Sequence, residues 1–241
     1  MPVAIAVLPQ PPLLVPALCG DAAVETEGLR EAVGTAVAAL AEHADTWVAV
    51  GADPGGRRTV APGTRGTFAG YGRDVPVALP GGDGGGDGGD TAADEGAELP
   101  LPLLVAAWAT AGAPVASVRG ELVAPDAPTA ECLALGAELA GEQVGLLVVG
   151  DGAAKHAQKA PGGFDPRAEA FDTVVAAAFD RADPAGLAGL DPAAAAALWA
   201  AGRAPWQVLA GAADGRSWTA AHRHTSMPYG VAYHVAVWEP A

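Results

Sequence analysis

The chain has 241 residues, of which 51% are hydrophobic, and it carries a formal net charge of −15. Such an acidic surface repels nucleic acid and anionic membranes, because phosphate groups are bound by clustered Lys and Arg, and the 13 basic residues form no extended run. Cys19 and Cys132 belong to no CxxC or Cys/His cluster, which excludes a disulfide-rich scaffold and a structural zinc site. The sequence shows neither a signal peptide nor an unbroken apolar stretch of ~18 residues, so we expect a cytoplasmic protein.

Predicted strands and helices alternate along the chain. Apolar runs predict strands at 3–8, 46–50, 115–118 and 144–149, with shorter extended segments at 67–70 and 75–79. Apolar residues at helical spacing predict helices at 21–42, 101–111, 129–140, 166–181, 191–200 and 204–213. The chain ends in a predicted β hairpin, 217–224 and 231–238. This order predicts one α/β domain over residues 1–241, with a central, mostly parallel or mixed sheet and helices on both faces.

Residues 81–98 interrupt this pattern, because they are mostly Gly and Asp and offer nothing to bury. Such a composition is typical of a flexible surface loop. We interpret it as an insertion within the single domain.

Three strand ends are candidates for a functional site, because ligands of open α/β sheets bind beyond the carboxyl ends of the strands. These ends are the turns at 9–12, 51–54 and 150–156, which contain Gln10, Asp53 and Asp151.

The first of these turns carries a family resemblance. Leu8-Pro9-Gln10-Pro11-Pro12-Leu13-Leu14 resembles the opening of the class III extradiol dioxygenase superfamily, the LigB-type ring-cleavage enzymes and their Memo-like relatives, where the strand ends in Pro-His-Pro-Pro-Leu-Leu. The likeness covers most of the chain. Gly51-Ala52-Asp53 corresponds to a Ser-Pro-His element, Asp151 to Ala154 to Asp-x-Ser-His, and Ala201-Gly202 to a late Cys-Gly or glutamate. Segments 159–162 and 202–206 are similar to an actinobacterial LigB-like subgroup.

The resemblance implies ferrous iron, held in the family by two histidines and a carboxylate, with a further histidine as general acid and base. Here Gln10 and Asp53 stand at the two histidine positions, Ala154 replaces the acid/base histidine, and Ala201 (or its neighbour Ala200) has no donor atom. Asp53 could bind a metal, whereas the Gln10 amide is a weak, neutral ligand. We therefore expect that Fe(II) is not bound stoichiometrically and that ring-opening activity is weak or absent.

Three functions stay open from the sequence. The first is a weakly active dioxygenase, and the second is a pseudoenzyme that binds a small molecule or a protein. The third is a metal-free enzyme that uses Asp151 and His156 in the same cleft. Lys155 and Lys159 add positive charge near Asp151 and favour an anionic ligand, and a small aromatic ligand follows from the resemblance. The alanine-rich helices leave a homodimer open.

The remaining histidines lie in predicted strands or at a helix end. His222 and His224 alternate along a strand and point to one face, which is typical either of a metal site or of a solvated strand face. His234 is interpreted as a hydrogen-bonded histidine of the sheet, and His43 as a structural residue at a helix C-terminus.

Overall fold

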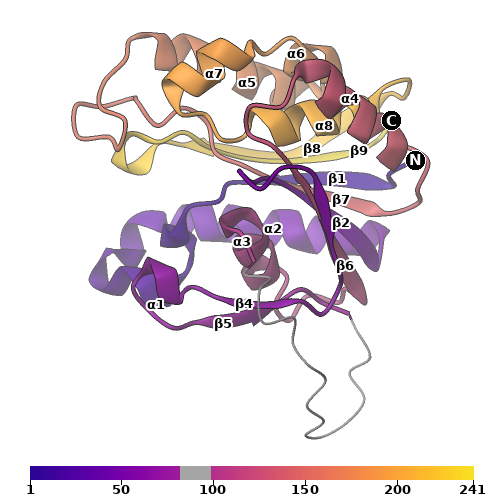
Figure 1. Ribbon diagram of the computed structural model, residues 1–241, viewed down its shortest axis with the longest axis horizontal. Coiled ribbons are helices and arrows are strands. Elements are labelled where there is room, and N and C mark those ends of the chain that lie inside the picture. Colours follow the sequence, from indigo (N-terminus) through magenta and orange to yellow (C-terminus); the bar gives the residue numbers. More distant parts are fainter. Residues whose placement is uncertain (82–98) are drawn as a thin grey trace, which may run out of the picture.

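The fold is a mixed sheet between two layers of helices, as Figure 1 shows, in a computed structural model that describes residues 1–81 and 99–241. The predicted α/β fold with helices on both faces is thereby confirmed. Apart from Gly81, the predicted Gly/Asp-rich loop lies outside the described residues.

Seven strands form the main sheet in the order β3-β6-β2-β7-β1-β9-β8. Strands β6, β2, β7 and β1 are parallel to one another, whereas β3, β9 and β8 are antiparallel to their neighbours. The bounds are β1 Ala4–Leu8, β2 Thr46–Ala52, β3 Arg58–Val60, β6 Ser117–Val123, β7 Gly145–Val149, β8 Trp218–Ser226 and β9 Tyr233–Pro240. A separate two-stranded sheet consists of β4 Arg65–Thr67 and β5 Pro76–Ala78.

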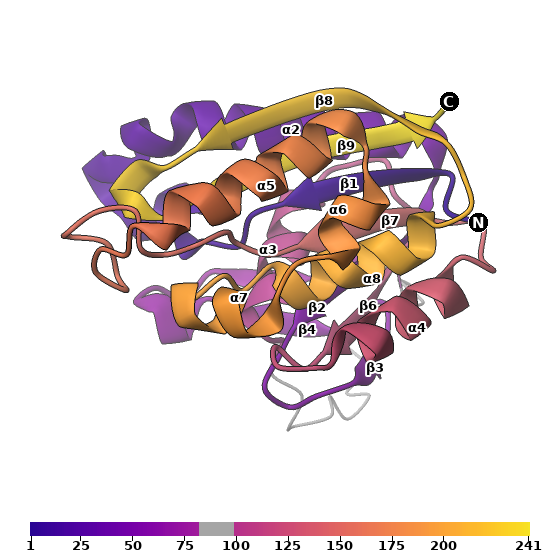
Figure 2. The same ribbon diagram turned by 90° about the horizontal axis from the view of Figure 1, so that it is seen from above.

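Helices cover both faces of the sheet, and Figure 2 shows the layer that contains α4 to α8 from above. The layer on the other face contains α1 Pro16–Cys19, α2 Glu27–His43 and α3 Leu101–Ala109. The layer seen in Figure 2 contains α4 Thr129–Leu139, α5 Arg167–Arg181, α6 Pro184–Ala188, α7 Pro192–Leu198 and α8 Arg203–Ala213. Short 3-10 turns are η1 Pro12–Leu14, η2 Gly20–Thr26, η3 Ala69–Tyr71 and η4 Pro228–Gly230. Within the described ranges, no helix has the length and apolarity needed to cross a membrane.

The core is divided by the sheet, and β1 shows how the sequence produces this. All five residues of β1 are buried, with Ala4, Ala6 and Leu8 in the cluster beneath α2 and Ile5 and Val7 in the cluster beneath α8. Successive side chains of a strand point to opposite faces, so a strand covered on both sides is apolar throughout. The unbroken apolar runs in the sequence reflect this double coverage.

Small residues bring helices α4 and α8 into close contact. A Cβ atom added to Gly136 would lie 2.1 Å from the Val208 carbonyl oxygen, and one added to Gly211 would lie 2.2 Å from the Leu133 carbonyl oxygen. The small residues of the sequence therefore allow the backbones of these two helices to approach closely.

Local differences from the expected elements concern short segments. Ala69 and Gly70, expected to be extended, belong to the η3 turn, and the strand expected at 115–118 begins at Ser117 and continues as β6 to Val123. Strand β3 and helix α6 were not predicted, because three to five residues are too short for a periodic signal. The predicted start of α7 is confirmed, since the Asp191 side chain accepts a hydrogen bond from the Ala193 N–H at 2.9 Å.

Candidate functional site

The topology brings the three predicted strand ends to one edge of the sheet. Strands β2, β7 and β1 are neighbours and run parallel, so their carboxyl ends lie side by side. The Gln10 N–H, just after β1, donates a hydrogen bond of 2.7 Å to Asp151 Oδ1, just after β7. Gln10 and Asp53 line the same pocket. Polar residues from segments far apart in the sequence therefore lie together at the edge of the sheet where the sequence predicted a site.

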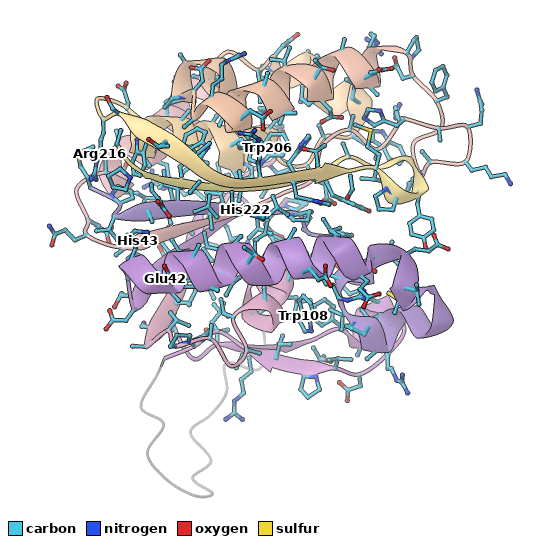
Figure 3. The ribbon with its side chains drawn as sticks, turned by 180° about the vertical axis from the view of Figure 1, so that it is seen from behind. Glu42, His43, Trp108, Trp206, Arg216 and His222 are labelled. Atoms are coloured by element: carbon cyan, nitrogen blue, oxygen red, sulfur yellow. The ribbon has the colours of Figure 1, made fainter. Side chains whose placement is uncertain are left out.

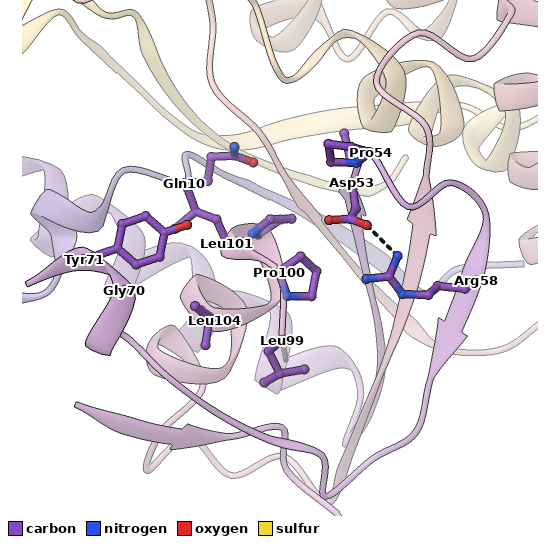
Figure 4. Close-up of a pocket in the computed structure, with 12 residues that line it drawn as sticks. Gln10, Asp53, Pro54, Arg58, Gly70, Tyr71, Leu99, Pro100, Leu101 and Leu104 are labelled. Atoms are coloured by element: carbon purple, nitrogen blue, oxygen red, sulfur yellow. Dashed lines mark hydrogen bonds and ion pairs between the residues drawn. The ribbon is translucent and has the colours of Figure 1, made fainter. Parts of the chain in front are cut away.

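The pocket has a volume of about 570 Å³ and two unlike walls. Figure 4 shows Gln10 and Tyr71 on one side, Asp53 with Arg58 on the other, and the start of α3 between them. The apolar part of the lining comes largely from Leu99, Pro100, Leu101, Pro102 and Leu104.

Asp53 is committed to its own loop and to Arg58. Its Oδ2 accepts hydrogen bonds from the Gly55 N–H at 2.8 Å and from Arg58 Nη1 at 2.5 Å. The Asp53 side chain is 16% exposed and that of Arg58 39%, so this ion pair lies at the mouth of the pocket. The pair neutralises the carboxylate, which reduces its strength as a metal ligand.

Asp151 is bonded to the Gln10 backbone and is not among the residues that line the pocket. Burial raises the pKa of the Asp151 carboxyl from 3.8 to about 7, although the hydrogen bond from the Gln10 N–H acts in the opposite direction. Tyr233 of β9 is 3% exposed, and burial together with the nearby Asp151 charge raises the pKa of its hydroxyl. Asp151 is therefore a carboxyl group that exchanges a proton near neutral pH.

The residues at this edge do not fit the iron site of the ring-cleavage dioxygenases that the sequence resembles. Gln10 Oε1 is shielded from solvent, Asp53 is paired with Arg58, and Ala154 and Ala201 supply no donor. Gly202, the residue after Ala201, does contact this edge, since its N–H donates to the Asp151 carbonyl oxygen at 2.7 Å. Over the described ranges, no group of three His, Cys, Asp or Glu residues is placed to hold a metal ion. A ferrous site needs three adequate protein ligands, which this edge does not assemble.

His156 lies elsewhere, in a network centred on the buried Asp172 of α5. Its Nε2 is 2.6 Å from Asp172 Oδ2, and the Nε2 of His234 is 3.1 Å from Asp172 Oδ1. The Ala153 N–H donates to Asp172 Oδ2 at 3.0 Å, and Thr225 Oγ1 is 3.1 Å from His234 Nδ1. His234 is hydrogen-bonded within the sheet, as its position in the strand predicted.

Sequence reasoning missed Asp172, although a signal for it exists. It shares the helical spacing of the buried Ala168, Val175 and Phe179, so a carboxylate occupies the apolar stripe of α5. A charged residue in such a stripe is buried and needs partners, and two of the chain's five histidines supply them.

Other predicted site residues do not line the Gln10–Asp53 pocket. His156 lines a separate pocket of about 120 Å³ together with Phe164, Asp165, Pro166 and Glu169. Lys155 Nζ lies 5.4 Å from the centroid of the Trp199 ring, and Lys159 is exposed. The structure therefore does not bring Asp151 and His156 to one pocket.

Comparisons with known proteins support the fold. Neither a family model nor a curated protein matches the chain. Among solved structures, it is similar to the uncharacterized protein JW3007 from Escherichia coli K12, with a TM-score of 0.53 and 13% identity, over 98% of this chain and 99% of that one. At this identity the similarity supports a shared fold and carries no statement about activity.

Proposed function

We propose that the chain is a divergent member of the class III extradiol dioxygenase superfamily that binds a small aromatic molecule in the Gln10–Asp53 pocket without iron. The Pro9-Gln10-Pro11-Pro12 turn at the end of β1 supports the family assignment. Replacement of the histidine ligands by Gln10 and Asp53, and of the acid/base histidine by Ala154, supports the loss of ring-opening activity.

The observation that carries the proposal is the two-walled pocket at the ends of β1 and β2. Its volume of about 570 Å³ lies within the range of small-molecule sites, ~300–1,000 Å³. Leucine and proline side chains at the start of α3 offer an apolar wall for a ring, and polar groups at Gln10 and Arg58 would fix its orientation.

The polar groups also define a ligand class. Gln10 Oε1 is shielded from solvent and has no hydrogen-bond partner within the described part of the chain, so a hydroxyl donor on the ligand would satisfy it after a small side-chain rotation. Arg58 uses Nη1 for Asp53, and its other N–H groups can bind a carboxylate. A hydroxylated aromatic acid combines these features.

The test is a binding screen in the presence of a metal chelator, with catechol, benzoate and salicylate observed by ligand-detected NMR. We expect salicylate to bind best, because it offers both the hydroxyl and the carboxylate. Gln10→Leu should weaken salicylate and catechol by about tenfold and leave benzoate unchanged. Arg181→Ala, at the exposed end of α5, is the matched control. Absence of binding by all three compounds would refute the proposal.

A second candidate is metal-free acid–base catalysis by Asp151, favoured by its pKa of about 7. Because a group with this pKa can both accept and donate a proton at neutral pH, it suits proton transfer to a ligand that reaches past Gln10. Any compound found in the screen would be incubated with the protein and followed for chemical change. Turnover by the wild type that Asp151→Asn abolishes, with binding retained, would establish this candidate; unchanged compound would eliminate it for that ligand.

A further inference from the structure

A stripe of polar side chains lines one face of β8, the edge strand next to β9. His222, His224 and Ser226 alternate along it, and their partners in register are Val237, Val235 and Tyr233. These three β9 residues belong to the core cluster that includes α2, and Figure 3 shows His222 beside that helix. The opposite face of β8 packs on α5, where Arg223 pairs with Asp180 at 3.3 Å. The two histidines therefore lie on the α2 side of the strand.

This stripe has unusual hydrogen bonding. His222 Nε2, His224 Nε2 and Ser226 Oγ are all shielded from solvent and have no hydrogen-bond partner within the described residues. Only two other side-chain atoms of the described ranges share this condition, Gln10 Oε1 and Trp206 Nε1. Buried polar atoms in native proteins are normally partnered, by protein, water or an ion. Two of these atoms are histidine ring nitrogens at alternating positions on one face of the strand, which indicates one partner that both rings bind.

The chemistry of the two rings narrows the identity of that partner. A neutral imidazole ring keeps a lone pair on one of its two nitrogens, and the Nε2 atoms of both rings lie on the same face of β8 without a hydrogen-bond partner among the described residues. The expectation of a solvated strand face does not hold at the Nε2 atoms. Neutral imidazole is the side chain that most often binds zinc, copper and nickel.

We propose that His222 and His224 bind one divalent transition-metal ion through their Nε2 atoms, with water completing the coordination. Histidines two residues apart on one face of a strand can reach a common ion, which would lie about 2.0–2.1 Å from each ring nitrogen. Affinity should follow the usual order for nitrogen ligands, with Cu²⁺ bound more tightly than Ni²⁺ or Zn²⁺. This site is independent of the Gln10–Asp53 pocket, since none of its residues lines that pocket.

The experiment titrates tag-free, metal-depleted protein with Cu²⁺ and reads the EPR spectrum, with calorimetry for Zn²⁺. We expect one equivalent of metal per chain and nitrogen hyperfine splitting. His222→Gln and His224→Gln should each weaken binding by more than about tenfold, because each removes one of two nitrogen ligands. Binding should also weaken as the pH falls, because a proton on the imidazole takes the lone pair that binds the metal. His43→Gln is the control, because His43 is exposed and pairs with Glu239 at 3.3 Å.

Unchanged metal affinity in the double variant His222→Gln/His224→Gln, or the absence of saturable binding by the wild type, would overturn the proposal. Circular dichroism and thermal unfolding establish that the variants are folded. If a variant does not fold, the imidazole ¹⁵N shifts of the wild type decide. Addition of Zn²⁺ must then move the Nε2 resonances of two histidines other than His43, and unmoved resonances contradict the site.

Discussion

The Gln10–Asp53 pocket and the network around Asp172 are both built from polar side chains, but their hydrogen bonding differs. Asp172 is 1% exposed and is bonded to the Ala153 N–H, His156 and His234. In the pocket, Gln10 Oε1 has no partner within the described residues, and Asp53 is paired only at the mouth. A network in which every polar group has a hydrogen-bond partner stabilises the fold, whereas a polar group without a partner is available to a ligand. Variants of the two regions should therefore affect different properties.

The largest effect is expected for Asp172→Asn. An amide offers one acceptor oxygen and turns donors toward its neighbours, so at least one of the three donors now bonded to Asp172 loses its partner inside the core. We expect the free energy of unfolding to fall by about 3–5 kcal/mol, measured by urea denaturation with tryptophan fluorescence. Asp180→Asn on the same helix removes the charge of a 51% exposed side chain paired with Arg223 and should cost less than about 1 kcal/mol. Equal effects of the two variants would contradict a structural role for the network.

The next effect is a pH dependence caused by Asp151. Its pKa of about 7 in the folded protein lies above its ordinary value of 3.8, so the folded state binds the proton more tightly than the unfolded state. Stability from this group is complete below pH ~4 and is lost as the pH rises to ~7. Asp151→Asn keeps an acceptor for the Gln10 N–H and removes the titration.

The wild type should therefore lose about 2–4 kcal/mol relative to Asp151→Asn between pH 4 and pH 8. Urea denaturation of both proteins at each pH gives this difference, and other titrating groups cancel in it. Parallel pH profiles of the two proteins would show that Asp151 is not buried as a carboxyl in the folded state.

A smaller effect is expected for Gly152→Ala. The added Cβ atom would lie 2.3 Å from Asp172 Oδ1 and 2.8 Å from the Ala232 Cβ, so the network must shift. We expect a loss of about 1–3 kcal/mol in thermal or urea unfolding. Gly34→Ala in α2 is the opposite control, because its Cβ meets nothing within 4 Å and should add about 0.5–1 kcal/mol. A stabilising Gly152→Ala would mean that the loop after β7 is not held against Asp172.

The smallest effect on stability is expected for Arg58→Ala. The Arg58–Asp53 ion pair is partly exposed and should contribute less than about 1 kcal/mol to folding. Loss of the guanidinium should nevertheless weaken salicylate and benzoate by more than about tenfold and leave catechol unchanged. Calorimetric titration of the three compounds measures this. Equal weakening of all three would indicate a damaged pocket rather than a lost carboxylate contact.

The sequence predicted the fold well, because the apolar runs of β1, β2 and β7 are covered on both sides and need no tertiary information to be recognised. It also predicted that Gln10, Asp53 and Asp151 follow these strands, since parallel strands end at one edge. It could not predict that Asp53 pairs with Arg58 or that His156 turns toward Asp172, because these contacts depend on loop conformation. Short elements such as β3 and η3 were missed because they contain too few residues to show a periodic pattern of apolar side chains.

The most direct test of the iron-free proposal is anaerobic reconstitution with Fe(II), followed by desalting, metal analysis and a catechol ring-opening assay in air. We predict far less than one iron per chain, no yellow ring-cleavage product, and the same salicylate affinity with Fe(II) as with a chelator. One tightly bound iron per chain together with yellow product would contradict the account, and it would mean that Gln10 and Asp53 serve as ligands in spite of their chemistry.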